Sequence, residues 1–263
     1  MVDKRLRLMI ISLNNLRAYF IDFLFRLAGF PVYIAIVYFL WKVILENSSL
    51  TGISLGFLVT YYTTMYAVRN IVEQWEIPGK ISNDVRQGHM VVPLTKPISY
   101  RSYLFWQSAL NSIFFLVLYA LILFALSIVF HMTFTSDPLI ILLFFISMIF
   151  AFMMNFAMFF TIGLSAFWME ENNGIVRMFM SVTSFLSGAW IPLDLLSGTL
   201  KDIALLSPFS LTSYFQVSIL QGKLSLEQII PEFALMIVWT LIFFLVAKFV
   251  WKLGERRYTG YGV

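Results

Sequence analysis

The chain of 263 residues has no cysteine, which excludes disulfide bonds, thiolate metal sites and cysteine nucleophiles. Only two residues are histidine, and only 12% of the residues are charged. Soluble domains have about 25% charged residues and about 45–50% apolar ones. Here 60% are hydrophobic, which is more apolar surface than one globular core can bury. The composition therefore predicts a membrane protein.

Motifs for nucleotide hydrolysis and metal chemistry are also missing. Residues 78–81, Pro-Gly-Lys-Ile, resemble the end of a phosphate-binding loop. That loop needs a glycine five residues before its Gly-Lys pair and a Ser or Thr after it, but these positions hold Gln74 and Ile81. The histidines, His89 and His131, fall on opposite sides of the predicted membrane and cannot share a metal ion. We expect no enzymatic activity and no cofactor bound by this chain.

A membrane-embedded glutamate protease is another enzyme class that the sequence disfavours. Glu170 and Glu171 would suit it only with histidines on nearby helices, and the sequence has none there. We interpret residues 170–174 as a charged turn between two spans.

Six apolar stretches are long enough to cross a membrane, since a spanning helix needs about 20 mostly apolar residues. They cover residues 21–44, 53–72, 104–130, 138–167, 174–192 and 229–251. No linker rich in Pro, Gly or Ser divides the chain. We predict an all-α membrane protein with six transmembrane helices and a single domain over residues 1–263.

The first 20 residues differ from the spans. Leu6, Met9, Leu13 and Leu16 follow helical spacing, while basic residues take the other face. This pattern predicts a helix lying in the membrane interface. A cleaved signal peptide is the alternative, but the apolar run that follows is too long and has no small-residue cleavage site.

The basic residues give the orientation. If both termini are cytosolic, fifteen of the eighteen Lys and Arg residues lie inside, and only Lys42, Lys201 and Lys223 lie outside. Cytosolic loops of membrane proteins are enriched in Lys and Arg. We therefore predict a multi-pass protein of a bacterial plasma membrane with both termini in the cytosol. The net charge of +4 is spread over short loops, so we expect no nucleic-acid partner.

Few polar groups are predicted inside the spans, and Asn111 and Asn155 are the clearest of them. Such residues more often form hydrogen bonds between helices than bind substrate. Buried carboxylates would mark an ion pathway. Their scarcity disfavours a transporter driven by protons or sodium, so the energy would have to come from a partner.

Residues 76–103 form the longest polar segment between spans, and on this orientation the segment is cytosolic. Ser82 or Asn83 can cap a short helix that Gly88 would end. Pro93 and Pro97 then favour an extended stretch. Such a helix can dock on a soluble partner, or it can be an ordinary connector, and the residues alone leave both open.

The same segment resembles the cytosolic loop of type-2 ABC exporter permeases. In that family an acidic-to-Gly stretch leads into a turn that ends in Pro-Ile-Ser or Pro-Leu-Ser, and it forms the coupling helix that contacts the ATPase. The matching coupling residues are Ile81, Ser82, Asn83, Asp84, Val85, Arg86, Gln87 and Gly88, and Pro97-Ile98-Ser99 follows. Residues 90–93 are Met-Val-Val-Pro where many relatives have leucines.

A second similarity to these permeases precedes the last span. It consists of the Gly-x-x-Ile-Pro-Leu and Pro-Phe elements, which are Gly188, Ile191, Pro192, Leu193, Pro208 and Phe209. The family has short re-entrant or interfacial helices there, on the outer face. Leu193, Leu196, Leu200, Ile203 and Leu206 form an apolar helical stripe, which also predicts interfacial helices over residues 193–227. A plain amphipathic outer loop is the alternative.

The resemblance implies the permease subunit of an ATP-driven ABC exporter. It implies a homo- or heterodimer of permeases above two ABC ATPase subunits, with ATP and Mg²⁺ on the ATPases. The second and fifth spans would line the dimer contact and the substrate path. The alternatives are a non-transporting scaffold or assembly subunit and, third, a secondary transporter. A path without charged residues would suit apolar or amphipathic cargo, although polar cargo stays open.

Overall fold

The computed structural model describes residues 20–47, 54–88, 99–130, 132, 134–169 and 171–257. Within these ranges every regular element is a helix, which confirms the predicted all-α class. The long elements are α2 (Phe20–Asn47), α3 (Leu55–Val72), α6 (Tyr100–Phe130), α7 (Pro138–Gly163), α8 (Asn173–Leu186) and α11 (Leu226–Arg257). The short ones are α4 (Glu76–Arg86), η1 (Leu164–Phe167), η2 (Leu193–Leu195), α9 (Gly198–Leu206), η3 (Ser210–Thr212) and α10 (Tyr214–Leu220).

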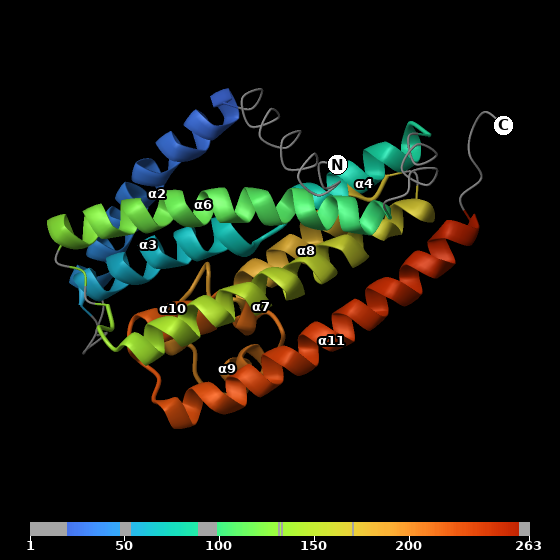
Figure 1. The fold of residues 1–263 in the computed structure, drawn as a ribbon. Helices are drawn as coiled ribbons and strands as arrows, with labels where there is room; N and C mark the ends of the chain where they lie inside the picture. The colour runs from blue at the N-terminus through green and yellow to red at the C-terminus, as the bar shows by residue number, and fades with distance from the viewer. Residues whose placement is uncertain are drawn as a thin grey trace, which may run out of the picture.

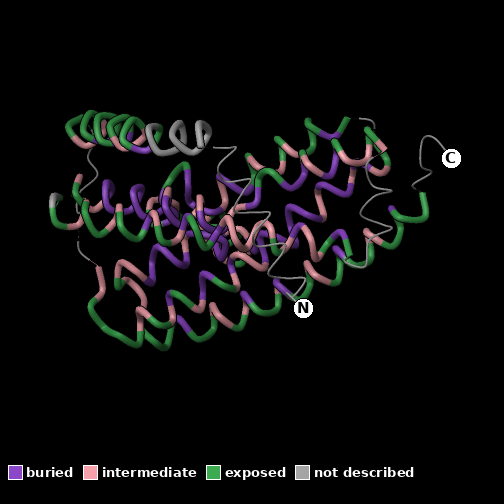
Figure 2. Tube along the Cα trace, turned by 45° about the horizontal axis from the view of Figure 1, so that its top comes forward, coloured by how far each residue is buried: buried purple, intermediate pink, exposed green. Residues whose placement is uncertain are grey.

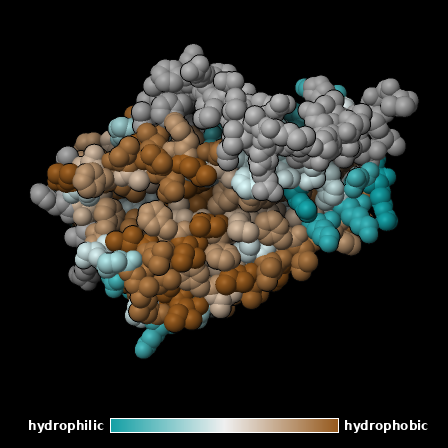
Figure 3. Space-filling view, in the orientation of Figure 1, coloured by the Kyte–Doolittle hydropathy of each residue, from teal (hydrophilic) through white to brown (hydrophobic). Residues whose placement is uncertain are grey.

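Four segments among the described residues are long and apolar enough to cross a membrane. They are Gly29–Asn47, Tyr100–Ile128, Pro138–Phe167 and Leu226–Arg257. These correspond to the first, third, fourth and sixth predicted spans. One face of the molecule is hydrophobic across its middle and hydrophilic at the end where α11 terminates (Figure 3).

The second and fifth predicted spans form α3 and α8, which do not meet this standard of length and composition. α8 has 14 residues, which at 1.5 Å per residue span about 21 Å, less than the roughly 30 Å of a bilayer core. It ends at Leu186, before the predicted end at residue 192, because Gly188 adopts a φ of 77° and turns the chain. Length and composition thus support four spans, and six remains a prediction.

α3 is surrounded by other helices along most of its length. It contacts α2, α6, α7 and α10, and most of its residues from Leu58 to Val72 are buried. Thr60, Thr63 and Thr64 each donate a hydrogen bond to a carbonyl one turn earlier, so their hydroxyls are satisfied without water. Figure 2 shows buried residues along the centre of the bundle and exposed ones on α2 and the outer faces.

The two ends of the bundle carry different elements. α4 lies at the end where α11 terminates, and α9 and α10 lie toward the opposite end (Figure 1). This arrangement agrees with the predicted separation of the cytosolic segment, residues 76–103, from the predicted outer helices, residues 193–227.

The start of the predicted coupling helix is wrong. We expected Ser82 or Asn83 at its N-terminus, but α4 begins at Glu76. Pro78 lies in its first turn, where a missing backbone N–H costs no helical hydrogen bond. Its predicted end is confirmed, because Gly88 adopts a φ of 72° and donates its N–H to the Val85 carbonyl at 3.3 Å. The predicted interfacial helix over residues 1–20 and the proline-containing stretch fall almost wholly outside the described residues, as do His89, His131 and Glu170.

Candidate functional site

α4 has one face buried in the bundle and one face exposed. Ile77, Pro78, Ile81 and Ser82 are buried at the helical spacing of one face. Two of the predicted coupling residues, Ile81 and Ser82, therefore face the bundle. A second group is accessible: Asn83, Arg86 and Gln87 are exposed, and Asp84, Val85 and Gly88 are half-buried. Only this second group is able to meet a partner.

The buried face of α4 packs directly on the end of α7, at Gly163. A Cβ atom added to Gly163 would lie 2.8 Å from Ile81 Cδ1 and 2.9 Å from Pro78 Cα. Real Cβ atoms essentially never approach other atoms below 3.0 Å. Glycine at this position therefore permits the contact between α4 and α7.

Polar contacts tie α4 to the first turns of α6. The Tyr100 hydroxyl donates to Asp84 Oδ2 at 2.6 Å, and Lys80 Nζ donates to the Gln107 side chain and to the Tyr103 hydroxyl. The Tyr100 ring stacks on Trp251 of α11 with a centroid distance of 5.9 Å. α4 is thus held to α6 and α7, and Tyr100 of α6 links this cluster to α11.

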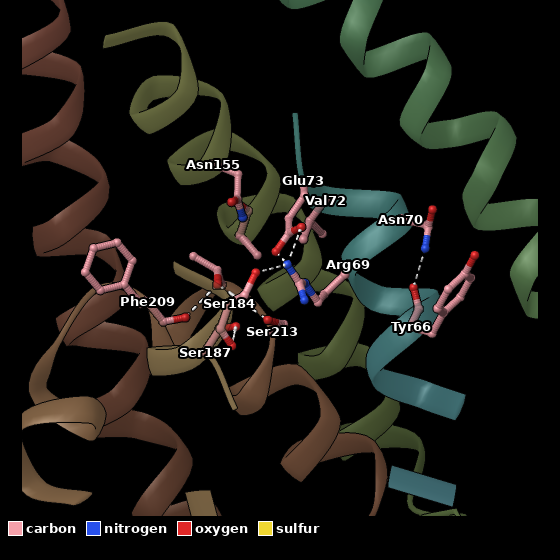
Figure 4. Close-up of polar contacts among 12 residues, drawn as sticks. Tyr66, Arg69, Asn70, Val72, Glu73, Asn155, Ser184, Ser187, Phe209 and Ser213 are labelled. Atoms are coloured by element: carbon pink, nitrogen blue, oxygen red, sulfur yellow. Dashed lines mark hydrogen bonds and ion pairs between the residues drawn. The ribbon is translucent and has the colours of Figure 1, made fainter. Parts of the chain in front are cut away.

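An ion pair lies at the end of α3, shown in Figure 4. Arg69 donates to both carboxylate oxygens of Glu73, from Nε at 2.6 Å and from Nη2 at 3.0 Å. Nη2 also donates to the Ser184 hydroxyl of α8 at 2.8 Å. The guanidinium lies 5.2 Å from the centre of the Trp75 ring. The pair therefore connects α3, α8 and the residues that lead into α4.

This ion pair is buried, with side-chain exposures of 14% for Arg69 and 1% for Glu73. Burial raises the pKa of the Glu73 carboxyl above its ordinary value, and the adjacent Arg69 charge opposes the shift. Sequence reasoning assigned Arg69 only to the cytosolic side and overlooked Glu73. The spacing of four residues was the available signal, because it places two opposite charges on one helical face.

Two cavities flank this ion pair. The first, of about 430 Å³, lies between α3, α4 and α6 and includes Asn70, Lys80, Gln107 and Asn111 in its lining. We call it the α6 cavity. The second, of about 310 Å³, lies between α3, α7 and α8. We call it the α8 cavity. Both are lined by Arg69, Glu73 and Trp75, so these residues form the wall between them.

Among the described residues, the two predicted intramembrane asparagines form no hydrogen bond to another helix. Asn155 is fully buried and donates to the Ala151 carbonyl of its own helix at 2.9 Å. Its Oδ1 has no partner among the described residues. Asn111 lines the α6 cavity instead.

The predicted outer motif is docked on α3. We use this name for Gly188, Ile191, Pro192, Leu193, Pro208 and Phe209. The Tyr61 hydroxyl donates to the Gly188 carbonyl at 2.8 Å, and the Tyr62 hydroxyl donates to the Trp190 carbonyl at 2.9 Å. The motif residues Pro192, Leu193 and Pro208 are buried. Glycine is required at position 188, since a Cβ there would lie 2.6 Å from Tyr61 Oη.

Two other motif residues are more accessible. Ile191 is exposed, and the half-buried Phe209 ring lies 6.0 Å from the Phe179 ring of α8. The predicted apolar stripe is not one helix, because η2 ends at Leu195 and α9 begins at Gly198. Leu200, Ile203 and Leu206 of α9 remain exposed.

A network of charged and aromatic groups closes the outer motif. Asp194 accepts hydrogen bonds from the Tyr214 hydroxyl, at 2.6 Å, and from Lys223 Nζ. The Lys223 ammonium lies 4.4 Å from the centre of the Phe57 ring at the start of α3. Burial, with the hydrogen bond to Asp194, raises the pKa of Tyr214 above its ordinary value. These contacts hold the segment between α8 and α11 against α3.

Comparison with known families decides the class of protein. A family described as ABC-2 family transporter protein matches residues 32–262. The chain belongs to the ABC-2 transporter family. No curated protein matches the chain. The match includes α3, α4, α8 and the outer motif, so both segments that carried the resemblance lie within it.

Membership of the ABC-2 family, together with the long apolar helices, identifies a membrane-embedded permease of an ABC-type transporter. Permeases of this family are typically membrane subunits without catalytic activity, and they associate with an ABC ATPase. The predicted family is confirmed. α4 contains most of the residues for which the resemblance predicts contact with an ATPase.

Proposed function

We propose that this ABC-2 permease is the membrane half of an ATP-driven exporter and receives force from a separate ATPase through α4. The observation that carries the proposal is the division of α4 into two faces. Its outer face offers Asn83, Arg86 and Gln87, and its inner face is locked against Gly163. A helix with this division can bind a soluble subunit and move with it.

Two connections support the transmission of this movement. The first runs through Ile81 and Pro78 to α7. The second runs through the three residues that join α4 to α3, where Glu73 is bonded to Arg69 and Arg69 to Ser184 of α8. A displacement of α4 would therefore reach α3 and α8, the second and fifth predicted spans.

A second permease chain is part of the proposal. α8 carries exposed apolar side chains at Ile175, Met178 and Val182, and Met178 is 70% exposed. A second copy, or a related permease, would cover this surface, with α3 and α8 at the contact and the substrate path. The six crossings, with both termini in the cytosol of a bacterium, agree with the concentration of Lys and Arg on one side.

ATP and Mg²⁺ belong on the partner subunits in this proposal. The chain has no complete phosphate-binding loop, since Gln74 and Ile81 occupy two of its required positions. The exposed face of α4 is polar, which suits a subunit that binds from the cytosol.

The experiment is copurification of the tagged full chain from its native membrane, with detection of any ABC ATPase. Arg86→Glu should lower ATPase recovery at least about tenfold, equivalent to about 1.4 kcal/mol. Arg86 is exposed, and its side chain bonds only the neighbouring Asn83 among the described residues, so folding should be preserved. Lys201→Glu on α9, at the opposite end, is the matched control and should leave recovery unchanged.

The proposal fails if no ABC ATPase accompanies the wild-type chain. That outcome would favour a scaffold or assembly role. Equal recovery with Arg86→Glu and the wild type would show that α4 is not the docking element.

A further inference from the structure

The α8 cavity has an excess of positive charge. Among the described residues, its lining contains Arg69 and Arg177 but only one carboxylate, Glu73. Arg177 is exposed on α8, and among the described residues its side chain has no ion-pair partner. A guanidinium that faces a cavity without a structural partner is available to bind an anion.

The ion pair leaves part of Arg69 available as well. Its hydrogen bonds to Glu73 and Ser184 use Nε and Nη2. Nη1 makes no hydrogen bond within the described part of the chain. Arginine has five N–H donors in a planar fork, so Glu73 can fix the orientation of the group while Nη1 still binds another oxygen.

A third group in the lining also lacks a partner. Thr183 is 1% exposed, and its hydroxyl has no hydrogen-bond partner among the described residues. Buried polar atoms in native proteins are nearly always hydrogen-bonded. The two arginines and this hydroxyl lie in one cavity, which is the arrangement expected around a bound anion.

The other walls of the α8 cavity are mainly apolar and aromatic. Phe159 lies on α7, Met180 lies on α8, and Trp75 and Trp190 add two aromatic rings, while Ser181 and Ser184 of α8 contribute hydroxyl groups. Small-molecule sites commonly combine such walls with a few polar groups that fix orientation. A free inorganic anion would leave these walls uncovered, whereas an amphiphile would cover them.

We infer that the α8 cavity binds an anionic amphiphile, with a phosphate or carboxylate held by Arg69 and Arg177 and an apolar part against Phe159 and the tryptophans. That such a molecule belongs to the class of exported cargo rests on the proposed function, because α3 and α8 line the proposed path. The inferred site differs from the sequence-based expectation of a path without charged residues, because Arg69 and Arg177 line it.

The α6 cavity is a poorer anion site, although it is larger. It contains Arg69 and Lys80 against Glu73 and Glu76, so its charges balance. Lys80 is also engaged by Gln107 and Tyr103. The inference is therefore confined to the α8 cavity.

The test uses the full chain in phosphatidylcholine nanodiscs and radiolabelled dodecyl phosphate as the probe, with binding to empty nanodiscs subtracted. Dodecyltrimethylammonium, dodecyl maltoside and inorganic phosphate are the competitors, at matched ionic strength. Unlabelled dodecyl phosphate should compete at least about tenfold better than each of them. Arg177→Gln should weaken probe binding about tenfold, and Arg256→Gln, which removes an exposed charge from α11, should change it less than twofold.

If Arg177→Gln does not reach the membrane, the double variant Arg69→Gln/Glu73→Gln provides the same test, because it leaves no unpaired buried charge. The inference is overturned if amphiphiles of every charge compete alike, or if the cavity variants bind as the wild type does. If inorganic phosphate competes as well as dodecyl phosphate, the claim that the ligand is an amphiphile is overturned.

The copurifying ATPase separates this inference from the proposed function. An ATPase partner without selective probe binding would refute the inference alone. Selective binding without any ATPase partner would keep the anion site but refute its assignment to exported cargo.

Discussion

Ile81 of α4 and Gly163 of α7 are in such close contact that a Cβ on Gly163 would lie 2.8 Å from Ile81 Cδ1. This contact joins the proposed ATPase-binding helix to one of the membrane-spanning helices. It also accounts for the burial of one face of α4, while Asn83, Arg86 and Gln87 are exposed on the other. The function of α4 in the proposed mechanism depends on this rigid contact.

We predict that Gly163→Ala separates α4 from α7. Overpacking of this kind typically costs 1–3 kcal/mol, so the melting temperature of the purified chain should fall and ATPase recovery should decline. Gly56→Ala on α3 is the matched control, because a Cβ there meets nothing within 4 Å. If both variants have the same melting temperature, the close packing at Gly163 does not limit the stability of the protein.

The buried ion pair gives a second prediction. Arg69→Ala leaves the Glu73 carboxylate buried without its partner, which typically costs 3–5 kcal/mol. Arg69→Met combined with Glu73→Leu should recover most of this loss, because no charge then remains buried. Chemical denaturation of the single and double variants measures both effects. A double variant no more stable than Arg69→Ala would contradict the account.

The third prediction concerns the turn at Gly188, which combines a φ of 77° with a close contact to Tyr61 Oη. Gly188→Ala should be more destabilising than Gly198→Ala, which has a φ of 62° but no atom within 4 Å of an added Cβ. The left-handed conformation costs roughly 1–2 kcal/mol in either variant. The additional destabilisation by Gly188→Ala therefore measures the effect of the contact with Tyr61 alone. Equal losses of stability in the two variants would show that this contact contributes nothing.

The sequence predicted the elements whose signals are local. The fourth span was placed at residues 138–167, and α7 with η1 covers Pro138–Phe167. At its start, Asp137 Oδ1 accepts the Leu139 N–H at 2.8 Å, which caps the helix. The end of α4 at Gly88 was equally readable, because a glycine there ends the helix in the left-handed conformation.

Other features arise from tertiary packing and had no local signal. The contact of Ile81 with Gly163 joins residues far apart in the chain, and neither residue indicates its partner. α3 was predicted as an ordinary span because its threonines and tyrosines acquire partners only after folding. The α8 cavity was overlooked for the same reason, since Arg69 and Arg177 come from different helices.

The central claim is that the exposed face of α4 contacts an ABC ATPase. Because the chain has no cysteine, a single cysteine at Gln87 provides a unique site for a short cross-linker to the copurifying ATPase. A cysteine at the exposed Ser197, at the opposite end, is the control. The account predicts a permease–ATPase adduct from Gln87→Cys and none from Ser197→Cys. Adducts of equal yield from both positions, or none from Gln87→Cys while the ATPase is bound, would contradict it.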